Sequence, residues 1–147
     1  MGRAPARHRA LDPFRRCRLV IFVDTNVLMY AVGGEHPLRR EARSFFERAL
    51  TRHERLVTSA EVLQELLHAY LPVNRLETLD AALTLADARV AVVWPVESED
   101  VRLARALVGR YPGLGARDLL HVACCRRRDV AEIKTFDRGL TAAFARP

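Results

Sequence analysis

The stretch Leu19-Val20-Ile21-Phe22-Val23 is continuously apolar, and it ends abruptly at the polar triplet Asp24-Thr25-Asn26. An unbroken apolar run rich in β-branched residues is typical of a strand that is buried on both faces of a parallel sheet. Ligands of open parallel sheets bind beyond the carboxyl ends of the strands, where Asp24 would lie. Asp24 is therefore a candidate site residue, although it would serve equally well as the cap of a short helix predicted over 26–31.

Strands alternate with helices along the rest of the chain, which predicts an α/β sandwich with a mainly parallel sheet. Three further apolar stretches are predicted strands, at 56–57, 90–94 and 133–136. Thr58 with Glu61 three residues later matches a capping box and predicts the start of a helix over 59–71. Apolar periodicity and start signals predict the remaining helices, at 37–52, 74–88, 98–108, 116–127 and 137–144.

The length of 147 residues suits one compact domain, but the charge is unevenly distributed along it. The net charge of +6 at pH 7 would by itself suggest a nucleic-acid or anionic partner. Residues 1–18 hold six arginines and one acid, whereas residues 19–147 hold 18 basic and 17 acidic residues. We therefore divide the chain into a basic, flexible arm over 1–18, for which a mis-assigned start codon is the rival explanation, and one domain over 19–147.

Hydropathy and cysteine usage indicate whether the protein inserts into a membrane and whether its thiols are reduced. No apolar run approaches the roughly 20 residues of a membrane span, so we expect no membrane insertion. The three cysteines are Cys17, Cys124 and Cys125, an odd number without metal-site spacing, and no secretory segment precedes them. We therefore expect a reduced, cytoplasmic protein in which Cys124 and Cys125 serve only for packing.

Four carboxylates occupy positions that suggest a shared site. Asp24 and Asp137 directly follow the first and last predicted strands. Glu65 lies in mid-helix, and Asp118 begins a helix that is apolar nearly all round. Simpler roles are helix capping for the two strand-end aspartates, a solvated helix face for Glu65 and complementation of a helix dipole for Asp118. Converging carboxylates could not all stay ionised without a counter-charge, so these acids either do not converge or bind a divalent metal. Oxygen ligands favour Mg²⁺ or Mn²⁺ over zinc.

The order of four sequence motifs resembles that of the PIN-domain ribonucleases, and most closely that of the toxins of VapBC-type toxin–antitoxin pairs. The likeness spans about residues 19–140, and the basic arm before the first strand departs from the usual pattern. The resemblance implies a PIN-like three-layer sandwich with a four- or five-stranded sheet flanked by helices. The motifs are Asp24-Thr25-Asn26-Val27-Leu28, Ser59-Ala60-Glu61-Val62-Leu63-Gln64-Glu65, Ala116-Arg117-Asp118-Leu119-Leu120-His121-Val122-Ala123 and Thr135-Phe136-Asp137.

The resemblance also implies an activity, a cofactor and partners. It implies Mg²⁺-dependent endonucleolytic cleavage of RNA, with Mn²⁺ as a substitute, neutralisation by a cognate antitoxin, and frequent homodimers. Ions held by carboxylates would activate a water to attack an RNA phosphodiester, and no side-chain nucleophile is required. The family's acidic quartet, as catalytic and metal-binding residues, falls on Asp24, Glu65, Asp118 and Asp137.

Other polar residues are candidates for the surroundings of that quartet. Thr25, Asn26 and Thr135 match polar positions around the family's acidic pocket, where they would orient the acids or hold water. Arg117 and Arg138, each beside a site acid in the sequence, are candidates for an RNA-contacting rim. A solvated surface role is the alternative for both arginines.

Two function classes besides an active nuclease stay open at this point. A receiver-like signalling domain also has an acidic pocket and a lysine near its last strand, and Asp24 and Lys134 would match these features. The strand ending at Trp94, however, offers no phospho-acceptor aspartate. A PIN-like module that binds RNA or protein without cleaving is the second alternative, against which the intact quartet argues. His121 is interpreted as a hydrogen-bonded core histidine that could assist Asp118, and Arg126-Arg127-Arg128 as a helix end that complements the dipole.

Overall fold

The computed structural model describes residues 18–146, which form a parallel four-stranded sheet flanked by helices. The predicted α/β fold is confirmed, because every strand pairing is parallel and the spatial order is β3-β2-β1-β4. The strands are β1 (Val20–Val23), β2 (Arg55–Ser59), β3 (Val92–Trp94) and β4 (Glu132–Lys134). The helices are α1 (Thr25–Val32), α2 (Arg39–Thr51), α3 (Ala60–Tyr70), α4 (Leu76–Arg89), α5 (Ser98–Leu107), α6 (Ala116–Arg127) and α7 (Arg138–Ala145).

The arm predicted over 1–18 lies outside the described residues, apart from Arg18, and so does Cys17. Among residues 18–146, no helix combines the length and the apolar character needed to cross a membrane.

Strand β1 lies between β2 and β4, which explains the unbroken apolar run that predicts it. Ile21 pairs with Leu56 on one side and Glu132 on the other. Phe22 and Val23 have no exposed surface at all. Because all the strands run in the same direction, their carboxyl ends meet at one edge of the sheet. The residues that follow β1, β2 and β4 are therefore brought together at that edge.

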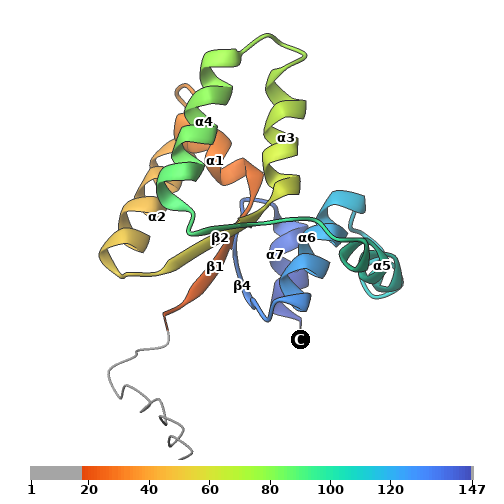
Figure 1. Ribbon diagram of the computed structural model, residues 1–147. Coiled ribbons are helices and arrows are strands. Elements are labelled where there is room, and N and C mark those ends of the chain that lie inside the picture. Colours follow the sequence, from red (N-terminus) through yellow and green to blue (C-terminus); the bar gives the residue numbers. More distant parts are fainter. Residues whose placement is uncertain (1–17, 147) are drawn as a thin grey trace, which may run out of the picture.

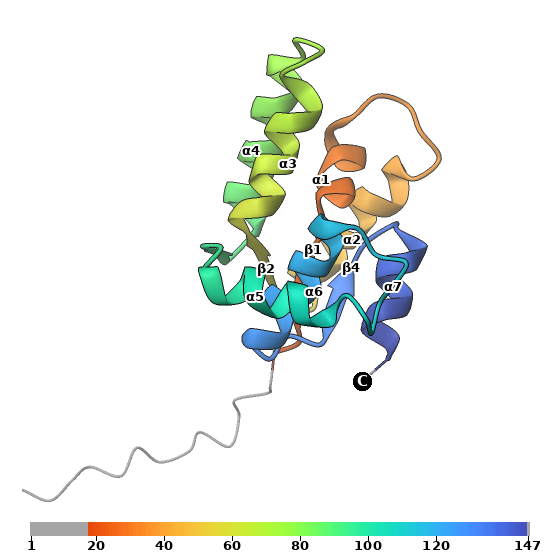
Figure 2. The same cartoon turned by 90° about the vertical axis from the view of Figure 1, so that its right-hand side faces the viewer.

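Helices cover both faces of the sheet, as Figures 1 and 2 show. Helices α1 to α4 share the main apolar core with the strands, around buried residues such as Phe22, Leu28 and Leu66. Helices α5, α6 and α7 enclose a second apolar cluster that includes Leu119 and Leu140. Helices α3 and α4 form a hairpin that extends beyond the sheet at the top of Figure 1. The predicted three-layer arrangement is thus observed.

The capping box expected at Thr58 and Glu61 is wrong. Thr58 belongs to β2 and is fully buried, and its hydroxyl donates a hydrogen bond of 2.8 Å to the backbone carbonyl of Val23. Helix α3 begins one residue later than expected, after Ser59, which makes no side-chain capping bond. A buried hydroxyl must find a partner within the protein interior, and the neighbouring strand offers Thr58 a carbonyl.

The basic end of α6 does more than complement the helix dipole, which corrects the interpretation from sequence. Asp100 of α5 is completely buried, and its Oδ1 accepts hydrogen bonds of 2.8 Å from both Arg127 and Arg128. The Arg128 guanidinium also lies 5.0 Å from the centre of the Trp94 ring. Helix α6 is therefore fixed to α5 and to the end of β3 by charge as well as by apolar contact.

Cys124 and Cys125, on the preceding turn of α6, are free and fully buried. Burial raises the pKa of the Cys124 thiol to about 11, so this residue is not ionised at neutral pH. The packing role expected for both cysteines agrees with their burial.

Candidate metal centre

Asp24 is placed at the carboxyl edge of the sheet by the strand that precedes it. Its backbone N–H donates to the carbonyl of Lys134 at 3.0 Å, and the residue is only 6% exposed. One carboxylate oxygen accepts from the N–H of Thr25 at 2.7 Å, and the other accepts from the Thr135 hydroxyl at 2.6 Å. The capping and site roles weighed for Asp24 are therefore compatible, because the carboxylate caps α1 while it lies at the centre of a polar cluster.

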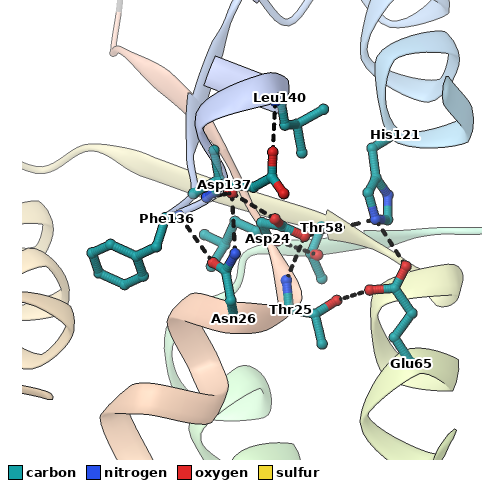
Figure 3. Close-up of polar contacts among 11 residues, drawn as sticks. Asp24, Thr25, Asn26, Thr58, Glu65, His121, Phe136, Asp137 and Leu140 are labelled. Atoms are coloured by element: carbon teal, nitrogen blue, oxygen red, sulfur yellow. Dashed lines mark hydrogen bonds and ion pairs between the residues drawn. The ribbon is translucent and has the colours of Figure 1, made fainter. Parts of the chain in front are cut away.

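Glu65 points from α3 into the same cluster, as Figure 3 shows. One of its carboxylate oxygens accepts a hydrogen bond from the Thr25 hydroxyl. The other lies 3.1 Å from Nε2 of His121 on α6. The solvated helix face considered for Glu65 is thus wrong, since its side chain is only 12% exposed.

His121 is the residue that the sequence did not assign to the site. It is 1% exposed, and its Nε2 atom lies 3.7 Å from Asp24 as well as 3.1 Å from Glu65. One donor atom from each of these three residues lies within 4.8 Å of the other two, a spacing at which they could hold one metal ion. The available signal was the spacing of three residues from Asp118, which places both side chains on one face of α6.

Asp118 and Asp137 surround this group without belonging to the closest cluster. Asp118 is half-buried in the first turn of α6, and burial together with the nearby carboxylates of Asp137 and Asp24 raises its pKa. Asp137 is exposed and caps α7, accepting from the N–H of Leu140 at 2.8 Å. Asp24 and Glu65 therefore lie in the same close cluster. Asp118 lies near enough for their charges to affect its pKa, and Asp137 lies at the rim.

The electrostatics of the cluster show an excess of carboxylate. Burial raises the pKa of Asp24, and this effect outweighs the lowering by His121 and by hydrogen bonds. Burial also acts to raise the pKa of Glu65, but hydrogen bonds from His121 and Thr25 outweigh it, so that pKa is lowered. For His121, burial alone would lower the pKa, whereas the carboxylates of Glu65 and Asp24 raise it above its usual value. A protonated His121 places a positive charge 3.7 Å from Asp24 and 3.1 Å from Glu65.

The predicted polar residues form a continuous hydrogen-bond chain behind Asp24. The Thr135 hydroxyl donates to Asp24 and accepts from Asn26 Nδ2 at 3.3 Å and from the N–H of Asp137 at 3.0 Å. The Asn26 side-chain oxygen in turn accepts from the N–H of Phe136 at 3.1 Å. Asn26 and Thr135 therefore hold the segment after β4 against the start of α1, whereas the Thr25 hydroxyl bonds Glu65 of α3.

The two candidate rim arginines are both exposed. Arg117 precedes Asp118 and is close enough that its charge helps to lower the pKa of Glu65. Arg138 is the first residue of α7, directly after Asp137. Lys134, which matched the late lysine of receiver domains, instead pairs with Glu41 of α2 at 2.9 Å.

Residues 21–145 match the PIN domain family. Ribonuclease VapC23 of Mycobacterium tuberculosis is 63% identical over 125 residues, which cover 85% of this chain and 98% of that protein. Ribonuclease VapC13 of the same organism is 43% identical over 120 residues, covering 82% of this chain and 92% of that protein. The chain belongs to the PIN-domain family, and within that family to the VapC ribonucleases.

Solved structures share the fold. VapC20 of Mycobacterium tuberculosis, described as a sarcin–ricin loop cleaving toxin, has a TM-score of 0.63 at 22% identity and covers 84% of this chain and 94% of its own. VapBC2 from Rickettsia felis, bound to a DNA fragment from its promoter, has a TM-score of 0.66 at 16% identity, covering 84% and 92%. Together with the placement of Lys134, the family match excludes the receiver-like alternative.

Proposed function

We propose that this chain is a Mg²⁺-dependent endoribonuclease that acts as the toxin of a toxin–antitoxin pair. The observation that carries the proposal is the meeting of Asp24, Glu65 and His121 within 4.8 Å of one another at the carboxyl edge of the sheet. Relatives that are 63% and 43% identical are named ribonucleases, which supports the activity. RNA is the proposed substrate, and water is the proposed nucleophile.

The residues of the site fit a divalent cation. Asp24 and Asp118 both have raised pKa values, Asp24 mainly through burial and Asp118 through burial and neighbouring carboxylates, as expected for acids that lack enough positive charge. Carboxylate oxygens suit Mg²⁺, with Mn²⁺ as a substitute that also accepts an imidazole nitrogen. Asp24, Glu65 and Asp118 are the proposed metal ligands, and Asp137 at the rim would hold a second ion or a coordinated water.

When bound, the cation supplies a Lewis acid for the phosphate and lowers the pKa of a water molecule. The chain itself fixes the acids before substrate arrives. Thr135 and the N–H of Thr25 orient the two oxygens of Asp24, while the Thr25 hydroxyl and His121 orient those of Glu65. Arg117 and Arg138 would offset repulsion between the acidic pocket and the RNA backbone from its rim. The thiols of Cys124 and Cys125 are buried and un-ionised, so neither supplies a nucleophile.

The direct test is to replace the proposed ligands while leaving the volume of the side chain unchanged. Asp24→Asn and Asp118→Asn should each lower the rate of RNA cleavage at least about 100-fold. Replacing residues that only orient metal ligands already lowers metal affinity or activity by about 10- to 100-fold. Cleavage of a mixed RNA pool is measured with Mg²⁺ and with EDTA, and the cut ends are mapped. Asp80→Asn, an exposed acid on α4, is the matched control and should cleave at the wild-type rate.

The same assay decides between the remaining alternatives. Asp137→Asn retains a good helix cap, so a loss of cleavage with an unchanged melting temperature would assign Asp137 to the site. Wild-type cleavage by both Asp24→Asn and Asp118→Asn would overturn the metal-ligand assignment. RNA binding by the wild-type protein without any Mg²⁺-dependent turnover would favour the non-cleaving PIN-like module.

A protein antitoxin is the proposed regulatory partner. The solved Rickettsia felis assembly is a VapBC pair, which supports this expectation for a chain of the same family. A small protein encoded beside this chain should co-purify with it and stop RNA cleavage at a one-to-one ratio. Failure to inhibit cleavage would remove that protein as the antitoxin.

A further inference from the structure

A cavity lined largely by apolar and aromatic surface borders the candidate metal centre. It has a volume of about 320 Å³ and runs along one face of α1 to the segment that follows it. Asn26 belongs to both places, since it lines this cavity and hydrogen-bonds Thr135 behind Asp24. Tyr30, Gly34, Glu35 and His36 also line it.

Aromatic rings make up the centre of this cavity. The His36 imidazole is stacked on the Tyr30 ring, with centroids 4.4 Å apart and planes inclined by 29°. Tyr30 also contacts the edge of Phe136 at 5.5 Å, which ties the stack to the segment beside Asp137. His36 is exposed, and its Nδ1 accepts from the N–H of Leu38 at 3.1 Å, which holds the imidazole in place. An exposed, fixed aromatic plane is a stacking platform for a nucleobase.

A cluster of arginines continues from the aromatic stack. A neighbouring cavity of about 550 Å³ shares Glu35 and His36 with the first. Its three arginines, Arg39, Arg40 and Arg43, outnumber its two acids, Glu35 and Glu47. The Nε atom of Arg39 is buried and has no hydrogen-bond partner among the described residues. Such a donor is costly to leave unpaired, and a phosphate oxygen is a suitable partner for it.

We infer that this cavity binds one unpaired RNA base next to the cleaved phosphate, with the base stacked on His36, whose other face rests on Tyr30, and the following phosphate on Arg39 and Arg40. The inference rests on the proposed ribonuclease function. Tyr30 lies four positions after Asn26 on α1, a rise of about 6 Å, which adjacent nucleotides of an unstacked strand can span. Planar rings followed by arginines match alternating bases and phosphates, which favours RNA over a protein segment as the occupant.

The test uses short single-stranded RNAs that contain a mapped cleavage site, with one nucleotide at a time replaced by a base-free ribose. For the wild-type protein with Mg²⁺, loss of one base beside the cut should lower kcat/KM at least about fivefold, because stacking of a base on aromatic side chains is worth that much or more. His36→Ala and Tyr30→Leu should lower kcat/KM on intact RNA by a similar factor and remove most of the penalty for the missing base.

Two further variants separate the cavity from general surface effects. Gly34→Phe should act like His36→Ala, because a Cβ at Gly34 meets nothing within 4 Å and the ring would fill the cavity without disturbing the fold. His68→Ala removes another exposed histidine, on the last turn of α3, and should retain the full penalty for the missing base.

Short single-stranded RNAs, intact or lacking one base and not restricted to mapped cleavage sites, are bound to Asp24→Asn protein, with and without His36→Ala, and followed by fluorescence anisotropy. Binding that weakens when one base is removed, and that no longer depends on that base in His36→Ala, would support base binding in the cavity. If this is observed and no RNA is cleaved, only the nuclease proposal fails. Cleavage or binding that is insensitive to every missing base would overturn the inference. An unchanged base penalty in His36→Ala, together with weaker binding of the antitoxin, would assign the cavity to the protein partner and overturn it as well.

Discussion

A single buried imidazole offsets part of the negative charge of the acidic cluster. His121 lies between Asp24 and Glu65, and its Nδ1 atom is buried without a hydrogen-bond partner among the described residues. An unpaired buried nitrogen is costly, so the contacts of Nε2 with the two carboxylates must outweigh that cost. In the absence of metal, the residue is therefore stabilised as an imidazolium ion, in agreement with its raised pKa.

This charge balance predicts that the metal-free protein loses stability as the pH rises. The folded pKa of His121 is raised above its ordinary value of 6.5, so its contribution to the free energy of unfolding is full below about 6.5. That contribution is lost as the pH rises through the folded pKa. The raised pKa values of Asp24 and Asp118 act in the same direction, because each lowers the free energy of unfolding as the pH rises above the ordinary pKa of 3.8. Glu65, whose pKa is lowered, is ionised throughout the neutral range.

Thermal unfolding in EDTA at pH 6, 7 and 8 measures this effect. The melting temperature should fall over the series, and His121→Gln should flatten the decline. Added Mg²⁺ should stabilise the protein more at pH 8 than at pH 6, because metal replaces bound protons. A metal-free melting temperature that rises with pH in this window would contradict the assignment.

At the scale of elements, helices α5 and α6 are joined by a buried ion network. Asp100 also accepts from the N–H of Glu97 at 2.8 Å, so its carboxylate both caps α5 and pairs with Arg127 and Arg128. Burial alone would raise the pKa of Asp100, but the hydrogen bonds from Arg128, Glu97 and Arg127 outweigh it and hold that pKa well below its usual range. Because α6 also carries Asp118 and His121, this network fixes the helix that completes the site.

Asp100→Ala should lower the free energy of unfolding by about 3 kcal/mol, since removing one partner of a buried ion pair leaves the other uncompensated. Urea denaturation measures the change. Glu99→Ala, an exposed acid on the same helix, is the control and should change stability by less than about 0.5 kcal/mol. A decrease below about 1 kcal/mol for Asp100→Ala would show that the arginines are satisfied by solvent.

At the scale of the whole molecule, we expect the basic arm predicted over 1–18 and the domain to have separable roles. Residues 1–18 carry five of the six net positive charges, whereas the proposed metal ligands all lie in the domain. Deletion of residues 2–18 should weaken RNA binding and reduce the slope of log affinity against log salt by up to about 0.7 for each phosphate that the arm neutralises. The cleavage rate at saturating RNA should be unchanged. A truncated protein that folds but does not cleave at saturation would contradict this division.

The predicted homodimer also belongs to this scale. The α3–α4 hairpin exposes four large apolar side chains, which makes it a candidate contact surface between two copies of the chain. They are Leu67, Leu71, Val73 and Leu76. If the hairpin is the dimer contact, Leu71→Glu should give a monomer in size-exclusion chromatography, because a buried carboxylate would lack a partner. Val101→Glu, at an equally exposed apolar position on α5, should leave the dimer intact.

The sequence by itself determined the features that depend on near neighbours along the chain. The unbroken run of Val20 to Val23 predicts a central parallel strand, because burial on both faces leaves no polar alternation. The position of Asp24 directly after that strand places it at the ligand-binding edge without any knowledge of packing. The order of short motifs then indicated the family and the four acids.

The tertiary structure decided which distant groups meet. His121 lies 56 positions from Glu65, and Thr135 lies 111 positions from Asp24, distances over which periodicity and capping rules carry no information. The same holds for Thr58, whose hydroxyl bonds Val23, and for Arg127 and Arg128, which pair with Asp100. Each of these polar groups is wholly or partly withdrawn from water and must find a partner inside the protein. Which partner it finds depends on how helices and strands pack, and only the folded chain fixes that.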